Sequence, residues 1–128
     1  MNRKILRVEK EPKTPFIELD PEKGVLTMEG RSIPEDPESF YNVVYSSMLD
    51  YYNSPQKLTT FHFQFEYINS GSSKFILRFF NLIRNQYDKG HDCIVNWYYE
   101  EDDENILDLG KHYENTFKLP FKFVEIYG

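Results

Sequence analysis

Cysteine and long hydrophobic runs are both scarce in this sequence. Its one cysteine, Cys93, excludes an internal disulfide and a zinc site built from several thiolates. Cys93 lies in an apolar stretch, which favours a buried, unreactive thiol over a nucleophile. No segment approaches the about 20 apolar residues of a membrane-spanning helix, and the charged residues 1–15 are unlike a secretory signal. We therefore expect a cytoplasmic protein without a membrane partner.

Positive charge is also in short supply. The chain has 15 Lys and Arg residues against 21 Asp and Glu residues, and its net charge is −6 at pH 7. Nucleic acids and anionic membranes are bound through basic patches, so this balance argues against both as main partners. It is compatible with a protein partner that presents Lys or Arg.

Signals of catalysis are missing as well. His62, His91 and His112 are scattered, and none has a second ligand at a metal-binding spacing. A hydrolase needs a base near its nucleophile, but the sequence has no Gly-x-Ser-x-Gly elbow and places no histidine beside the serine cluster of Ser70, Ser72 and Ser73. A glycine-rich phosphate loop is also absent. We expect no enzyme activity, no catalytic residue, no metal and no cofactor.

One acidic run leaves three interpretations open. Residues 100–104 are five consecutive carboxylates. Carboxylates bind Mg²⁺, although such sites usually also recruit a substrate phosphate. They also favour the positive N-terminus of a helix that follows them. The third interpretation is an acidic docking surface for a partner, with Glu101, Asp102 and Asp103 as the expected contacts.

Aromatic residues, in contrast, are abundant. The chain of 128 residues contains 11 Phe and 10 Tyr. Aromatic rings suit pleated, half-buried surfaces, so we expect a sheet with a ring-rich core. This length is enough for one domain, which we assign to residues 1–128. Residues 1–13 are either a loosely ordered arm or a poorly regular first strand.

The pattern of apolar and polar residues predicts five strands, some from alternation and one, residues 93–99, from a mostly apolar run typical of a buried strand. They are residues 16–20, 25–29, 58–65, 93–99 and 121–127. The first two form a hairpin, because the turn between them contains Pro21 and Gly24.

Three helices are predicted between the later strands. The first begins at Pro37, after the capping residue Asp36. Its apolar stripe consists of Phe40, Val43, Val44, Met48, Tyr51 and Tyr52. The second follows the serine cluster and ends at Lys89-Gly90, and the third follows the acidic run. Strands separated by helices imply parallel neighbours, so we predict an α/β fold with a single mixed β-sheet and helices packed against it.

The serine cluster lies where the second helix begins. Ser70, Ser72 and Ser73 are placed beside unpaired backbone N–H groups and the positive end of the helix dipole. A phosphate added there would gain hydrogen-bond partners. The alternative is that one serine simply caps the helix.

A loop before the first helix is the other unusual segment. Residues 30–37 contain polar, apolar and proline residues, and the two prolines stiffen the loop. It is either an ordered turn that leads to a helix or a contact surface with little entropy to lose. The expected contacts are Arg31, Ser32, Ile33, Pro34 and Glu35.

Three short motifs follow one another along the chain. They are Gly30-Arg31-Ser32-Ile33-Pro34-Glu35, then Glu66-Tyr67-Ile68-Asn69-Ser70 with Ser72-Ser73-Lys74, and Trp97-Tyr98-Tyr99-Glu100-Glu101-Asp102-Asp103. Together they resemble the SiaC family of small bacterial regulatory phosphoproteins. The similarity runs from about residue 14 to residue 123. Each motif alone is weak evidence for the family, but three motifs in the same order are specific to it.

The resemblance implies a fold like that of anti-sigma-factor antagonists, the STAS type. It also implies a phosphorylation switch. A dedicated kinase phosphorylates one hydroxyl at the start of the helix after the Phe-rich strand, and a PP2C-type phosphatase removes the phosphate. In the best-known branch, the unphosphorylated form activates a diguanylate cyclase, which raises cyclic di-GMP and promotes biofilm.

Carried over to this chain, the resemblance implies Ser70 as the phospho-acceptor. In the family a threonine commonly follows the asparagine and a serine follows that, whereas this chain has Ser70 and then Gly71. We expect Gly71 to loosen the loop, and Ser72 is the alternative acceptor. The expected surroundings of the phosphosite are Asn69, Gly71, Ser73 and Lys74.

Three functional hypotheses follow from the sequence. The first is a non-catalytic adaptor controlled by phosphorylation, and it rests mainly on the resemblance. The second is a constitutive binding module whose serines only cap a helix. The third is a metal-dependent enzyme that uses the carboxylates of residues 100–103.

Overall fold

The computed structural model describes residues 3–127, which form one six-stranded sheet and three helices. The strands are β1 (Leu6–Val8), β2 (Phe16–Asp20), β3 (Val25–Ser32), β4 (Leu58–Ile68), β5 (Asp92–Glu100) and β6 (Phe121–Ile126). The helices are α1 (Pro37–Tyr52), α2 (Ser70–Asp88) and α3 (Glu104–Phe117). The N-terminal segment therefore contributes a short edge strand, β1, which pairs with β2.

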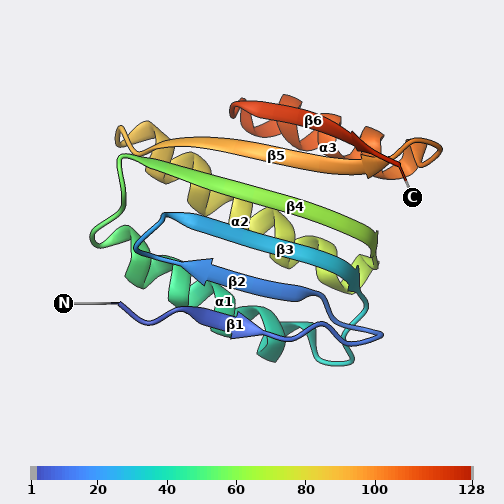
Figure 1. Cartoon of the computed structure of the whole chain (residues 1–128), viewed down its shortest axis with the longest axis horizontal. Coiled ribbons are helices and arrows are strands. Elements are labelled where there is room, and N and C mark those ends of the chain that lie inside the picture. Colours follow the sequence, from blue (N-terminus) through green and yellow to red (C-terminus); the bar gives the residue numbers. More distant parts are fainter. Residues whose placement is uncertain (1–2, 128) are drawn as a thin grey trace.

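The order of the strands in the sheet is the same as their order in the chain. Strands β1, β2 and β3 are antiparallel neighbours, and β3 to β6 are parallel neighbours with one helix in each connection. All three helices cover the same face of the sheet (Figure 1). The predicted α/β fold with a single mixed sheet is confirmed. No helix within residues 3–127 is long and apolar enough to span a membrane.

The core between the sheet and the helices is rich in aromatic rings, as predicted. Phe61, Phe63 and Phe65 of β4 point inward, while the residues between them are half-buried on the open face. The indole ring of Trp97 is fully buried, and its N–H donates to the carbonyl oxygen of Ile106 at 2.8 Å. The ring centres of Phe63 and Trp97 lie 6.2 Å apart at an angle of 66°, and ring pairs of this kind stabilise a core beyond the area that they bury.

Two strands extend three residues beyond the end that the sequence pattern predicts. Strand β3 continues to Ser32 instead of ending at Glu29, and β4 continues to Ile68 instead of ending at Phe65. A bulge between Gly30 and Arg31 shifts the register, and Gly30 adopts φ of 126°, a conformation that glycine tolerates best. The strand thus continues through a bend that interrupts its alternation, and Ser32 belongs to a strand and not to a loop.

The buried face of α1 also differs from the prediction. Val43 was expected inside but is 53% exposed, whereas Tyr41 was not expected there and is 1% exposed. Tyr41 enters the core because its hydroxyl finds a hydrogen-bond partner there, the Ser32 side chain. The predicted cap is confirmed, since the Asp36 side chain accepts from the Ser39 backbone N–H at 3.1 Å.

Candidate functional site

The predicted site segments follow three parallel strands and therefore lie along one edge of the sheet. Residues 33–36 follow β3, residue 69 follows β4, and residues 101–103 follow β5. These connections lie at the right-hand edge of the sheet in Figure 1. The carboxyl ends of parallel strands are where α/β proteins commonly place their binding sites.

An asparagine, not a serine, caps helix α2. The side-chain oxygen of Asn69 accepts from the Ser72 backbone N–H at 2.8 Å. The alternative in which one of the serines is the cap is therefore wrong. Ser70 is the first helical residue, and Gly71 follows it inside the first turn, so Gly71 does not loosen a loop as expected.

The serines of this turn differ in exposure. Ser70 is exposed, whereas Ser72 is completely buried. Ser73 is half-buried and donates from its hydroxyl to the Asn69 carbonyl oxygen at 3.2 Å. Lys74 is exposed, with its Nζ 5.2 Å from the centre of the Phe75 ring. A kinase can reach Ser70 in the folded protein but cannot reach Ser72 without opening the core.

Three buried hydroxyls connect the two predicted segments. The Ser72 hydroxyl donates to the Ser32 carbonyl oxygen at 3.2 Å, and the Ser32 hydroxyl donates to the Ser72 oxygen at 2.9 Å. Each serine has then used its one proton, so Tyr41 must donate to the Ser32 hydroxyl oxygen. Burial raises the pKa of Tyr41 to about 12, so this hydroxyl stays protonated well above neutral pH.

The main chain strengthens the same connection. The Asn69 N–H donates to the Ser32 carbonyl oxygen at 3.0 Å. The end of β3 and the start of α2, far apart in sequence, are therefore held as one unit. Sequence reasoning missed Tyr41, and its position one residue from the predicted apolar stripe was the available signal.

The segment at residues 31–35 contains both surface and buried side chains. Arg31 and Glu35 are exposed and Ile33 is half-buried, so these three can contact a partner. Ser32 and Pro34 are buried, and their side chains hold the segment in place instead.

The acidic segment lies farther along the edge. Glu101 and Asp102 are exposed, and the Asp103 side chain caps α3 by accepting from the Ile106 N–H at 3.0 Å. The interpretation that these acids favour a helix N-terminus is confirmed for Asp103. Within residues 3–127, no group of three or more His, Cys, Asp and Glu side chains could hold a metal ion.

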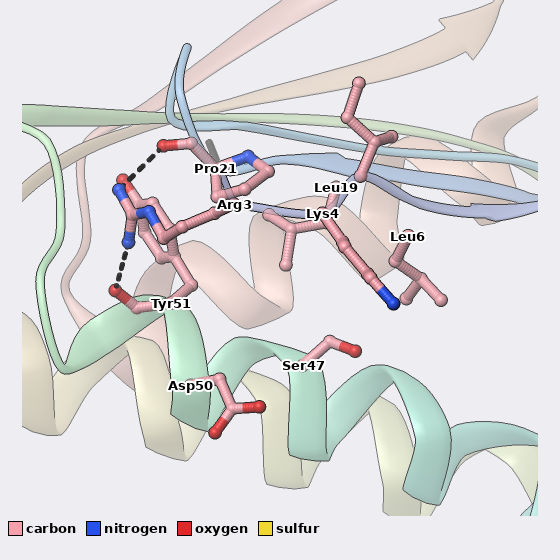
Figure 2. A pocket seen from close by; sticks show the side chains of 9 residues that line it. Arg3, Lys4, Leu6, Leu19, Pro21, Ser47, Asp50 and Tyr51 are labelled. Carbon is pink, nitrogen blue, oxygen red and sulfur yellow. Dashed lines mark hydrogen bonds between the residues drawn. The ribbon is translucent and has the colours of Figure 1, made fainter. Parts of the chain in front are cut away.

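A hollow of about 510 Å³ lies elsewhere, between the N-terminal segment and α1. Figure 2 shows the Arg3 guanidinium beside it, donating to the carbonyl oxygens of Pro21 at 3.0 Å and Tyr51 at 3.4 Å. The hollow is lined by Arg3, Lys4, Ile5, Leu6, Leu19, Pro21, Ser47, Asp50 and Tyr51. None of these residues belongs to the predicted site.

Comparisons with known proteins agree on one family. A family model described as SiaC family regulatory phosphoprotein matches residues 8–126. An uncharacterized protein of Pseudomonas aeruginosa strain UCBPP-PA14 is 23% identical over 108 residues, which is 84% of this chain and 86% of that protein.

Two solved structures have the same fold. One match is a chain in the crystal structure of the diguanylate cyclase SiaD in complex with its activator SiaC from Pseudomonas aeruginosa. The TM-score is 0.89 and the identity is 21%, and the match covers 94% of this chain and 99% of the matching chain. The other is apo-SiaC from the same organism, with a TM-score of 0.87 and 22% identity over 95% of this chain and 99% of that one.

Proposed function

Because the chain belongs to the SiaC family of regulatory phosphoproteins, we propose that it is a non-catalytic, partner-switching adaptor whose phosphorylation controls binding to a target protein. The acceptor is Ser70. The observation that carries this assignment is the contrast in burial between exposed Ser70 and fully buried Ser72 in the same helical turn.

The proposed target is a diguanylate cyclase or a similar signalling enzyme. This rests on the solved complex in which SiaC of Pseudomonas aeruginosa is the activator of the diguanylate cyclase SiaD. The switch further requires a Ser/Thr kinase and a PP2C-type phosphatase as partners. Kinases and diguanylate cyclases consume nucleoside triphosphates, so the proposed site of action is the cytoplasm.

The partner surface is the edge of the sheet around Ser70. Arg31, Ile33 and Glu35 are the accessible side chains on the segment bonded to α2, and Glu101 and Asp102 extend the surface along the edge. A phosphate adds about −1.5 to −2 charges at neutral pH. A partner packed against a small neutral serine would lose contacts and face an uncompensated charge, so phosphorylation lowers its affinity.

The first test is mass spectrometry of the intact protein and its peptides, purified from the native host under several growth conditions. A phosphate on Ser70 is expected. A phosphate on Ser72 would overturn the acceptor assignment, and an unmodified protein under all conditions would favour the constitutive binding module.

The second test measures binding of variants to the candidate cyclase. We expect Ser70→Ala to bind constitutively and Ser70→Asp to bind more weakly, because the carboxylate places charge in the interface. A coupling of about 3 kcal/mol corresponds to a change of about 150-fold in affinity. Ser73→Ala is the matched control and should bind like the unchanged protein. Equal binding of Ser70→Ala and Ser70→Asp would contradict the proposed phosphorylation switch.

The hypothesis of a metal-dependent enzyme has a separate test. If the carboxylates of residues 100–103 bound Mg²⁺ in the folded state, adding Mg²⁺ would raise the melting temperature. We expect no shift, because Asp103 already uses one side-chain oxygen to cap α3.

A further inference from the structure

We propose that Lys13 is an internal binding partner for the phosphate on Ser70, and that it exchanges Glu35 for the phosphate when the group is added. This inference rests on the proposed function, and it identifies how the modification changes the partner surface. Lys13 lies in the connection between β1 and β2. That connection reaches the same edge of the sheet as the start of α2 (Figure 1).

Hydrogen bonds place Lys13 close to the phosphosite. The Lys13 carbonyl oxygen accepts from the Ile33 N–H at 2.9 Å. The preceding residue, Ser32, accepts at its carbonyl oxygen from the Asn69 N–H at 3.0 Å. Asn69 directly precedes Ser70, so two main-chain hydrogen bonds and two peptide links join Lys13 to the acceptor.

The present partner of Lys13 holds it weakly. The Lys13 Nζ lies 3.9 Å from a Glu35 carboxylate oxygen, and the side chains of these residues are 63% and 90% exposed. Ion pairs with this exposure contribute little and are screened by salt. The Lys13 ammonium is therefore free to move to a stronger anion nearby.

Lys10, in the same connection, has an exposed ion pair of its own and an additional packing contact. Its Nζ lies 3.8 Å from a Glu66 carboxylate oxygen. Its Cε also lies 3.0 Å from the position that a Cβ would occupy on Gly30, so the aliphatic chain packs over that glycine. This packing restrains Lys10 and makes Lys13 the cation that changes partner.

A phosphate on Ser70 acts on both members of the Lys13–Glu35 pair. The dianion attracts Lys13 and repels Glu35, and it also repels Asp36 at the start of α1. Lys74, four residues after Ser70 on the same helical face, adds a second cation. Since Glu35 belongs to the proposed partner surface, the exchange removes a charge pair from that surface and leaves Glu35 uncompensated.

The test uses protein in which phosphoserine is incorporated at position 70 during synthesis, so that neither the kinase nor the target is needed. ³¹P NMR at low salt follows the second pKa of the phosphate, which is about 6 in an unperturbed phosphoserine. A nearby cation stabilises the dianion and lowers this pKa. We expect Lys13→Gln to raise it by about half a pH unit relative to the otherwise unchanged phosphoprotein.

Two further variants sharpen the result. Glu35→Gln removes a repelling charge and should lower the phosphate pKa, whereas Lys13→Gln should raise it. Lys23→Gln removes the same unit of charge from the exposed turn between β2 and β3, at the other edge of the sheet, and should leave the pKa unchanged.

The proposal is overturned if Lys13→Gln titrates like the unchanged phosphoprotein. A rise in pKa with Lys74→Gln or Arg31→Gln alone would then assign the phosphate to that cation instead. Such a result would leave the adaptor function intact, because that function fails only if the native protein carries no phosphate or if Ser70 variants bind their target equally.

Discussion

At the residue scale, the hydroxyls of Ser32, Tyr41 and Ser72 share three protons in the core, and each donates one. Ser72→Ala removes the acceptor of the Ser32 hydroxyl proton and leaves that buried O–H without an acceptor, although the Ser32 oxygen still accepts from Tyr41. An unmade buried hydrogen bond costs about 1–3 kcal/mol. We therefore expect Ser72→Ala to lower the free energy of unfolding by about that amount, measured by urea denaturation.

Ser73→Ala is the matched control for this prediction. The Ser73 hydroxyl is half-buried and only bonds back to the Asn69 carbonyl oxygen. Its loss should cost less than about 1 kcal/mol, because water can replace it. Equal losses for the two variants would contradict the structural role given to Ser72.

The same residues show the limits of the sequence at this scale. The pattern placed hydroxyls at the start of a helix but could not say which one is buried, because burial depends on Ser32 and Tyr41, 40 and 31 positions away from Ser72. Exposure of Ser70 is set by the same packing. The cap was predicted for Asp36, and for Asp103 a favourable position at a helix N-terminus was predicted, since both effects act within a few residues.

At the element scale, two helical glycines predict opposite effects of adding a methyl group. A Cβ on Gly71 in α2 would lie 3.7 Å from its nearest neighbours, an ordinary contact. A Cβ on Gly110 in α3 would lie 2.5 Å from the buried Trp97 ring. We expect Gly71→Ala to stabilise the protein by about 0.5–1 kcal/mol and Gly110→Ala to destabilise it by about 1–3 kcal/mol.

Thermal unfolding of both variants checks this pair. Alanine favours the helix at either position, so the difference in sign isolates the clash with Trp97. Destabilisation by Gly71→Ala would mean that the first turn of α2 is more crowded than the structure shows.

Helices and strands were predictable from the sequence where their apolar residues recur with one clear period. Strand β4 alternates cleanly and was found from the sequence, although its last three residues were missed. The bend at Gly30 hid the end of β3, because a bulge breaks the period of two on which the prediction depends. In α1, rings on several faces of the helix blurred the apolar stripe, so Val43 was placed inside in error.

At the scale of the whole molecule, the aromatic core predicts a late phase of tyrosine ionisation. Burial raises the pKa of Tyr41 and Tyr113 to about 12 and raises that of Tyr52 still further. These folded-state pKa values exceed the unfolded value of about 10, so the neutral forms stabilise the protein below pH 10 and that contribution is lost as pH rises toward 12.

Absorbance at 295 nm, with far-UV circular dichroism on the same samples, measures this behaviour. We expect most tyrosines to ionise near pH 10 and a late group to ionise only near pH 12 or on unfolding. Tyr113→Phe should reduce the late phase. Ionisation of all tyrosines in one step near pH 10, with the circular dichroism still native, would contradict the buried core.

The order of helices and strands was enough to predict a mixed sheet, but not which face the helices cover. That depends on the order of strands in the sheet, which no local pattern carries. Here each right-handed crossover moves one strand in the same direction, so successive helices fall on one side. If the strand order in the sheet reversed partway, helices would cover both faces, although the sequence pattern of helices and strands would be similar.

The agreement between strand order and chain order also determines how the molecule is built during synthesis. Each strand pairs with the one made just before it, so no strand has to insert between two that are already joined. Pairing between strands that follow one another in the chain also keeps each loop to be closed as short as a helical crossover allows. Every residue of the Ser32–Tyr41–Ser72 network has been synthesised by residue 72 of 128, so this network can assemble before β5, α3 and β6 exist.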